Sequence, residues 1–321
     1  MKAIYISETG GPDVLHYRED VEAPSSQDPD DILVHVEVAG VNYIDTYYRE
    51  GIYHETLPFI PGQEGTGRVL KDPKGEIAEG TLVAWCSALG SYAEQVIVPR
   101  DRLVAVPEGV HPHVAASMLL QGITAHYLTD GVAELKEGDS CVITAGAGGV
   151  GLLATQMAAA RGARVYTVVS SDEKEELSYA AGATEVFRYS ENLAETIRRR
   201  NGGYGVDVVY DGVGKDTFQE SLEVVRPRGI VCLFGAASGP VPPVDPQVLN
   251  THGSIFLTRP SIGAYTAGEG EFRMRAQAVT QMLVDGKLNI RIGGVYPLAD
   301  AAQAHRDLQE RKTTGSLVLE V

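Results

Sequence analysis

The sequence predicts an α/β protein of two domains, one β-rich and the other built on a doubly wound parallel sheet. First, its 321 residues exceed the roughly 250 to 300 at which a single hydrophobic core stops growing. Second, short strand-like runs separated by turns fill residues 1–110. Third, strand-like and helical segments alternate later in the chain, which indicates parallel strands with helices on both faces.

Alternating apolar residues identify the main strand of the first part. Ile32, Val34, Val36 and Val38 recur with a period of two, the pattern of a strand with one buried face. We expect a barrel-like unit here, because further strand-like runs follow at short intervals. These runs are residues 65–69, 81–85, 92–98 and 103–106.

The alternating region follows two helical stretches, at residues 114–120 and 124–132. Its short β-branched runs are expected to form the strands of the parallel sheet. They occupy residues 141–144, 165–169, 206–210, 230–234 and 254–258, with helical segments at 152–161, 173–181 and 193–200. We expect a helix at 271–285 and a strand at 317–319 to return the chain to the first domain.

Charge and composition narrow the function classes. The net charge is -16, from 43 acidic and 27 basic residues, so the surface should repel nucleic acids and anionic lipids. The basic run 198–200 ends a helical segment, where cations favour the helix dipole. The sequence contains neither a signal peptide nor 18 consecutive apolar residues, so we expect a cytoplasmic protein. Its three cysteines are expected to be reduced core residues.

A glycine-rich turn predicts a dinucleotide site. Gly146, Gly148 and Gly151 match the G-x-G-x-x-G pattern, directly after a strand-like run and before an apolar helix. In such a turn one glycine makes the tight bend, one lets the pyrophosphate approach and one lets the helix pack, while the helix N-terminus favours phosphate. Gly149 and Val150 complete the segment.

The end of the next strand favours NADPH over NADH. NAD enzymes place an acidic residue there to bind the ribose hydroxyls, whereas this chain has Ser170 and Ser171. Small hydroxyls leave room for a 2′-phosphate, and Lys174 can supply its countercharge. Asp172 and Glu173 keep NADH open as an alternative, since either carboxylate could face the ribose; both are also typical of a helix first turn.

Six segments along nearly the whole chain resemble the zinc-free quinone oxidoreductase (zeta-crystallin-like) branch of the medium-chain dehydrogenase/reductase superfamily. These segments are residues 10–15, 40–47, 122–125, 147–151, 210–214 and 258–261. The resemblance implies a GroES-like catalytic domain at residues 1–122 and 263–321, with a Rossmann NADPH domain at 123–262 inserted in it. It also implies a homodimer, because Arg259 follows the strand that commonly pairs across the dimer in this family.

The resemblance further implies a set of cofactor contacts. Taken alone, Tyr189 could be a surface ring and Arg311 a helix C-terminal cation. Besides the glycine turn, the implied contacts are Asn42, Gln121, Thr124, Ser170, Lys174, Tyr189, Gly235, Thr258 and Arg311.

The same resemblance argues against a metal. The positions of the cysteine and histidine that bind catalytic zinc in related alcohol dehydrogenases are Asn42 and Gln63 here, and neutral amides are poor zinc ligands. Three cysteines cannot form a four-cysteine structural site. We therefore expect no metal site, and a substrate that accepts hydride without a Lewis acid.

A quinone is such a substrate, so the sequence predicts an NADPH-dependent quinone reductase. We expect Asn42 to hold the carboxamide or a substrate oxygen, with Tyr47 and Tyr53 lining the acceptor pocket. The tyrosines could instead form a packed helix face. Two other functions stay open: reduction of the activated double bond of an enone or alkenal, and a non-catalytic NADPH-binding scaffold.

Overall fold

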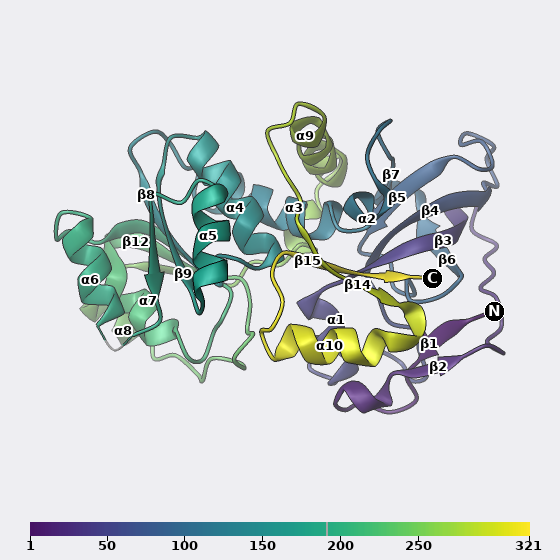
Figure 1. Ribbon diagram of the computed structural model, residues 1–321, viewed down its shortest axis with the longest axis horizontal. Helices are drawn as coiled ribbons and strands as arrows, with labels where there is room; N and C mark the ends of the chain where they lie inside the picture. The colour runs from purple at the N-terminus through teal and green to yellow at the C-terminus, as the bar shows by residue number, and fades with distance from the viewer. Residues whose placement is uncertain (191) are drawn as a thin grey trace. The chain divides into compact units, whose positions relative to one another are not determined.

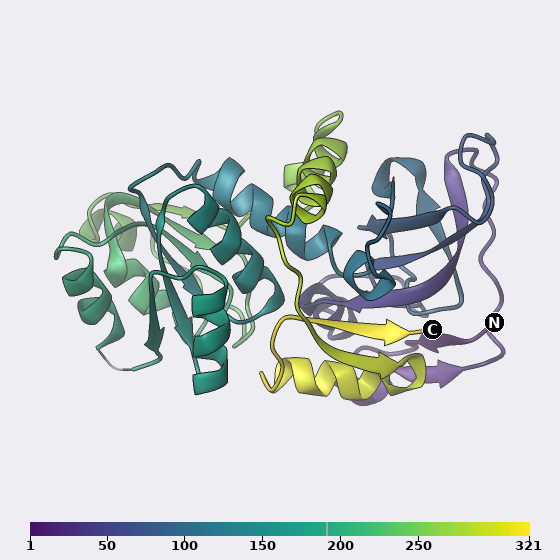
Figure 2. The same cartoon turned by 45° about the horizontal axis from the view of Figure 1, so that its top comes forward.

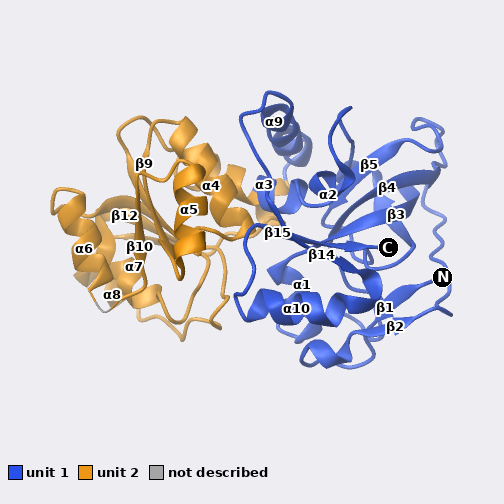
Figure 3. Ribbon diagram, viewed as in Figure 1, with its two compact units in different colours: residues 1–123, 268–321 blue, residues 124–267 orange. Residues whose placement is uncertain are grey.

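The protein, described by a computed structural model over residues 1–190 and 192–321, divides into two units. Unit 1 comprises Met1–Ile123 and Gly268–Val321, and unit 2 comprises Thr124–Ala267 (Figure 1, Figure 3). The chain thus leaves unit 1, forms unit 2 and returns to unit 1. The domain limits expected from the sequence, 122/123 and 262/263, differ from these by one and five residues.

Unit 1 is organised around β3 (Asp31–Val41), the strand expected from the period-two pattern. Ile32, Val34 and Val36 are fully buried, which confirms that pattern. The C-terminal strand β15 (Ser316–Glu320) pairs with β3 antiparallel, so the chain end lies beside its N-terminal part (Figure 2). The other strands of this sheet are β14 (Ile292–Pro297), β4 (Glu64–Lys71), β5 (Leu82–Cys86), β7 (Leu103–Ala105) and β6 (Gln95–Pro99).

The helix expected at 114–120 is wrong, because the chain forms two helices there. They are α2 (Pro112–Ala115) and α3 (Leu119–His126). Ser117 lies between them, and its hydroxyl donates to the carbonyl of His113 at 3.0 Å, a local bond that competes with helix continuation. Helix α3 then crosses the boundary between the two units and continues as a π-helical segment, Tyr127–Val132.

Two short strands of unit 1 were not assigned from the sequence, and a short helix was considered only as an alternative for its tyrosines. Strands β1 (Ala3–Tyr5) and β2 (His16–Arg18) pair antiparallel in a sheet of their own. Helix α1 (Tyr43–Arg49) follows β3 directly and has seven residues. Segments this short span too few periods for an apolar pattern to identify them. Unit 1 also contains α9 (Glu271–Val284), α10 (Ala301–Gln309) and the 3₁₀ turns Pro12–Val14, Arg100–Arg102 and Leu298–Asp300.

Unit 2 contains the predicted parallel sheet. Among its described residues the strand order is β10-β9-β8-β11-β12-β13, and each neighbouring pair is parallel. From β8 the chain proceeds to one edge through β9 and β10, and then to the other edge from β11. In such sheets ligands bind at the carboxyl ends of the strands near this reversal. The strands are β8 (Ser140–Thr144), β9 (Arg164–Val169), β10 (Glu185–Arg188), β11 (Val206–Asp211), β12 (Val225–Leu233) and β13 (Phe256–Thr258).

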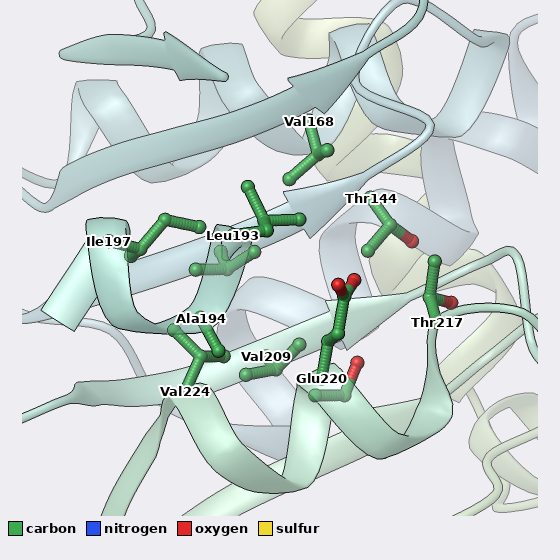
Figure 4. Close-up of a pocket in the computed structure, with 11 residues that line it drawn as sticks. Thr144, Val168, Leu193, Ala194, Ile197, Val209, Thr217, Glu220 and Val224 are labelled. Atoms are coloured by element: carbon green, nitrogen blue, oxygen red, sulfur yellow. The ribbon is translucent and has the colours of Figure 1, made fainter. Parts of the chain in front are cut away.

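Helices cover both faces of this sheet, as the sequence predicted (Figure 1). Helices α4 (Gly149–Ala160) and α5 (Asp172–Ala180) follow β8 and β9. Helix α6 (Leu193–Arg200) packs against α7 (Phe218–Val224). Helix α7 was not predicted from the sequence. A mostly apolar pocket lies between α6, α7 and the sheet, lined by residues such as Val168, Leu193 and Ile197 (Figure 4). These side chains belong to the apolar core of unit 2, so we assign the pocket no ligand. Short helices α8 (Gln247–Thr251) and Ala264–Thr266 complete the unit.

The cysteines are buried and free, as expected. Cys86, Cys141 and Cys232 are each fully buried, and burial raises the pKa of all three thiols. None of the helices in the described part of the chain has the length and apolar character that crossing a membrane requires.

Candidate functional site

The glycine turn of unit 2 connects β8 to α4 with little space for side chains. A Cβ atom on Gly146 would lie 2.6 Å from the Cβ of Thr167, and one on Gly151 would lie 2.4 Å from the carbonyl oxygen of Ala145. Gly148 is less crowded, with its nearest neighbour at 3.3 Å. The left-handed residue of the turn is Ala145, with φ 51°, so the expectation that a glycine makes the tight bend is wrong. The glycines here serve close approach rather than unusual dihedral angles.

The turn presents the N-terminus of a 12-residue helix. Gly148 is the N-cap of α4, and Gly149 and Val150 are its first two residues. The first intrahelical bond runs from the amide of Leu152 to the carbonyl of Gly148 at 2.9 Å. The preceding amides have no carbonyl partner within the helix, and together with the helix dipole they favour an anion. Geometrically, the segment suits a phosphate group.

The end of β9 brings Ser170 and Lys174 together. Lys174 Nζ donates to Ser170 Oγ at 3.3 Å, and Ser171 caps α5 by accepting from the amide of Lys174. Asp172, one of the two acids that kept NADH open, forms an ion pair with Arg188 at 2.7 Å. This strand end therefore carries small hydroxyls and an ammonium, with one neighbouring carboxylate bound by an arginine.

Tyr189 ties the end of β10 to the glycine turn. The amide of Ala145 donates to its hydroxyl oxygen at 3.0 Å, while the ring stays 38% exposed. The carboxyl ends of β8, β9 and β10 thus place the glycine turn, Ser170, Lys174 and Tyr189 along one edge of unit 2.

The remaining predicted contacts of unit 2 lie on other segments. Gly235 follows β12, and its Cβ position would be 2.4 Å from the carbonyl oxygen of Gly212, so a side chain has no room there. Thr258 ends β13, pairing in register with Cys232. Thr124 is buried, and its side chain forms a hydrogen bond with Tyr127. Burial raises the pKa of Tyr127, whereas this bond lowers it.

In unit 1, Asn42 belongs to a buried chain of hydrogen bonds. Asn42 Nδ2 donates to Glu64 Oε2 at 2.9 Å, and Asn42 Oδ1 accepts from Gln121 Nε2 at 3.0 Å. Gln121 Oε1 in turn accepts from the Ser316 hydroxyl at 2.7 Å. The structure thus brings Asn42 and Gln121 together, and each amide nitrogen keeps a second hydrogen that these bonds do not use.

Glu64 determines which group donates and which accepts along this row of hydrogen bonds. Its Oε1 accepts from the amides of Leu119 and Leu120, both at 2.8 Å, at the start of α3. Burial raises the pKa of Glu64 to about 8, although these three donors act in the opposite direction. The ionised carboxylate only accepts, so in that form Asn42 turns its NH₂ group towards Glu64 and its oxygen towards Gln121. Gly40 makes room, since a Cβ there would lie 2.9 Å from Glu64 Oε2.

The tyrosines near Asn42 have different roles. Tyr43 donates to the carbonyl of Leu308 at 3.0 Å, which is a packing role. Tyr47 and Tyr53 lie edge to face with ring centroids 5.5 Å apart, and Tyr53 contacts Tyr48 in the same way. Tyr47 is half-buried and Tyr53 is 36% exposed, so this aromatic cluster reaches the surface of unit 1.

Arg311 is exposed and follows α10 with φ 58°, the left-handed position that ends many helices. Its amide donates to the carbonyl of Leu308 at 3.1 Å. Burial raises the pKa of Tyr43 to about 12, and the nearby Arg311 charge acts in the opposite direction. Arg311 therefore lies near α1.

A buried hydrogen-bond network, which the sequence analysis did not predict, anchors α1 to the rest of unit 1. Asp45 Oδ2 accepts from the amide of Asn42 at 2.8 Å and from the Tyr92 hydroxyl at 3.1 Å. Tyr92 Oη lies 3.0 Å from His305 Nε2, and His305 Nδ1 lies 3.0 Å from Arg49 Nη1. Arginine only donates, so Nδ1 accepts and Nε2 carries the proton. Burial raises the pKa of Asp45 to about 7.

The two positions that correspond to zinc ligands in related alcohol dehydrogenases are occupied by amides here. Asn42 is engaged by Glu64 and Gln121, and Gln63 is a buried amide. Within residues 1–190 and 192–321, no group of three or more His, Cys, Asp or Glu side chains could hold a metal ion.

Comparison with known proteins gives matches over the whole chain. Residues 28–108 match the alcohol dehydrogenase GroES-like domain, and residues 149–283 match the zinc-binding dehydrogenase family. The chain is 39% identical to quinone oxidoreductase from Pseudomonas aeruginosa, with 99% of each protein covered. It is 35% identical to 2-haloacrylate reductase from a Burkholderia species, over 99% of this chain and 98% of the relative.

Solved structures agree with these matches. The Escherichia coli quinone oxidoreductase complexed with NADPH is 34% identical, with a TM-score of 0.96 over 100% of both chains. A mycobacterial protein complexed with NADPH is 46% identical, with the same TM-score of 0.96 and the same coverage of 100%.

We expect Glu64→Gln to destabilise the protein although it is isosteric. The new NH₂ group must face either the amides of Leu119 and Leu120 or the NH₂ of Asn42, and all of these are donors. At pH 9, above the raised pKa of Glu64, the free energy of unfolding in urea should fall by about 1.5–3 kcal/mol, the range for bonds to a charged group. Glu94→Gln is the control, because Glu94 accepts one backbone amide at an exposed site. A Glu64→Gln variant as stable as wild type would contradict this assignment.

His305 makes the stability of the protein depend on pH. Burial, and secondarily Arg49, lower the pKa of His305 to about 3 from 6.5. The folded state thus binds fewer protons than the unfolded state between these values, so stability is complete above pH 6.5 and is lost as pH falls towards 3. His305→Gln can offer an acceptor and a donor without titrating.

Lowering the pH from 7.5 to 5 should therefore cost wild type about 2 kcal/mol more unfolding free energy than it costs His305→Gln. Urea unfolding of both proteins at the two pH values measures this difference. Asp45 and Glu64 are present in both, so their own titration largely cancels. Equal losses in the two proteins would mean that His305 is not held neutral.

Proposed function

Because the chain belongs to the quinone oxidoreductase family of the medium-chain dehydrogenase/reductase superfamily, we propose that it reduces a quinone with NADPH, without zinc. The observation that carries the cofactor choice is the contact of Lys174 Nζ with Ser170 Oγ at the end of β9. An NAD enzyme has an acidic residue at this strand end. The NADPH complexes of two similar proteins support the same choice.

NADPH would be held mainly at the carboxyl edge of the unit 2 sheet. The amides at the start of α4 suit its pyrophosphate, and Ser170 with Lys174 suits its 2′-phosphate. Tyr189 is fixed beside the turn by its bond to Ala145. The further contacts that we propose are Thr124, Gly235 and Thr258, together with Asn42, Gln121 and Arg311 of unit 1.

When bound, NADPH supplies the hydride; a proton from solvent completes reduction of the quinone to the hydroquinone. The chain's own task is then to bind and orient the acceptor. The amide groups of Asn42 and Gln121, whose orientation Glu64 fixes, can each donate their second hydrogen to a carbonyl oxygen. The Tyr47–Tyr53 cluster supplies aromatic surface for a planar ring.

A second reaction is reduction of an activated carbon-carbon double bond, which also needs direct hydride delivery. The 2-haloacrylate reductase, 35% identical along the chain, favours this candidate. A quinone carbonyl and an enone carbonyl would use the same hydrogen-bond donors, so turnover is the measurement that separates the two reactions.

A panel of quinones and enones, assayed by NADPH oxidation, tests the proposal. We expect quinones to be reduced fastest and Asn42→Ala to lower kcat by about 10- to 100-fold, since it removes one or two hydrogen bonds. Tyr47→Phe should lower quinone turnover less and leave NADPH affinity nearly unchanged. Asn42→Ala should lower NADPH affinity only slightly, because it removes one of many proposed cofactor contacts. Tyr204→Phe, at an exposed tyrosine, is the control.

Faster turnover of enones would favour the double-bond reductase, and NADPH binding without turnover would indicate the scaffold. Unchanged kinetics in both Asn42→Ala and Tyr47→Phe would remove these residues from the site. Thermal unfolding of Asn42→Ala shows whether a loss of activity reflects a loss of fold, because Asn42 is buried.

We also propose that the protein is a cytoplasmic homodimer without a nucleic-acid partner. Its acidic balance and buried free cysteines support the location and the absence of nucleic acid. The edge strand β13 supports the dimer, because it exposes Phe256 by 64% and its outer side is unpaired within the described sheet. Arg259 follows this strand and donates to the carbonyl of Phe234 at 2.7 Å.

Light scattering after size exclusion tests the dimer. Wild type should have twice the mass of one chain, and Phe256→Lys should shift the mass towards one chain because a charge at the edge opposes pairing. Val295→Lys is the matched control, since Val295 is a 44% exposed apolar residue on the edge strand β14 of unit 1. A monomeric wild type, or a Phe256→Lys dimer as stable as wild type, would refute this interface.

A further inference from the structure

Arg188 lies at the carboxyl edge of the unit 2 sheet, next to the end of β9 that carries Ser170. It is the last residue of β10 and pairs in register with Val169, which directly precedes Ser170. Its Nη2 lies 2.7 Å from Asp172 Oδ1 and 2.5 Å from Glu175 Oε2. One guanidinium nitrogen therefore bridges two acids from the first turn of α5.

These two acids flank the segment that we propose to bind the 2′-phosphate. Ser171 caps α5, and Lys174 lies between Asp172 and Glu175 in its first turn. A free carboxylate there would repel a phosphate and could accept a hydrogen bond from a ribose hydroxyl, which favours NADH. The Asp172 side chain is fully exposed, so only its ion pair restrains it.

We propose that Arg188 is a positioning residue that sets the preference for NADPH over NADH. Its single positive charge offsets part of the combined charge of Asp172 and Glu175 and holds both acids away from the phosphate, which leaves the Lys174 charge effective. Arg188 Nη1 is buried and Nη2 is bound to the two acids, so the guanidinium acts through these acids rather than by touching the phosphate. The inference rests on the proposed NADPH function and identifies what determines its cofactor specificity.

The local charge balance gives the direction of the effect. Without Arg188 the site loses one positive charge, and two carboxylates become free to turn towards the ribose. NADPH affinity should fall, while NADH affinity should be unchanged or rise. The ion pairs are partly exposed, with 34% of the Arg188 side chain accessible, so solvent screening limits the effect.

The experiment measures dissociation constants of NADPH and NADH by nicotinamide fluorescence, with the full chain. We expect Arg188→Ala to lower the NADPH preference roughly 1.5- to fivefold, the scale of a partly exposed ion pair. Arg188→Lys should keep most of it. In the triple variant Arg188→Ala, Asp172→Asn, Glu175→Gln the preference should return, because the acids no longer need neutralising.

Two controls separate local from general effects. Arg226 is an ion-paired arginine of similar exposure, 32%, bonded to Asp207 near the amino ends of β12 and β11. Arg226→Ala should leave the NADPH preference unchanged. Lys174→Ala should lose NADPH affinity whether or not the two acids are present, as a direct phosphate ligand would.

The outcomes distinguish the two proposals. Wild type that prefers NADPH, with an Arg188→Ala variant of equal preference or a triple variant that does not recover, overturns the role of Arg188 alone. Equal loss of both cofactors in Arg188→Ala would indicate a merely structural role and also overturn it. Wild type that binds NADPH no better than NADH overturns the proposed NADPH function, and the Arg188 role with it.

Discussion

The buried carboxylate of Glu64 is the constraint on which the rest of the unit 1 site depends. It accepts from two amides at the start of α3 and from the side chain of Asn42, so it joins β4, the end of β3 and α3 in one contact. A group that can only accept imposes direction on every amide beyond it, from Asn42 through Gln121 to Ser316. Burial makes the charge costly and raises the pKa of Glu64 to about 8, and the three donors offset only part of that cost.

In unit 2 the main requirement is different: the carboxyl edge of the parallel sheet must bind the negative charge of phosphate groups. Backbone amides at α4, the Lys174 ammonium and the Arg188 guanidinium meet three consecutive strand ends. The fold supplies this edge by its topology, because the chain turns from one side of the sheet to the other next to β8. The side chains at this edge then determine which phosphate and hydroxyl groups it can bind.

The sequence predicted those features that depend on local pattern. Period-two burial in β3 and the glycine turn after β8 were both visible, because each is fixed by residues close together in the chain. The network of Asp45, Tyr92 and His305 was not, since 213 positions separate Tyr92 from His305 and neither lies in a motif. The break between α2 and α3 was missed for a similar reason: Glu64, 55 residues earlier, binds the amides that begin α3.

The contrast between Asn42 and a metal ligand shows how one position can change the chemistry of a scaffold. The zinc-binding relatives that the sequence resembles have a thiolate there, which polarises substrate through the ion. An amide in its place cannot do so, and left free to flip it would offer a carbonyl oxygen as often as an N–H. Glu64 removes that ambiguity, because only one orientation of Asn42 satisfies it. The site thus changes from one that binds an electrophilic metal to one that presents fixed hydrogen-bond donors, and such a site suits acceptors that take hydride directly.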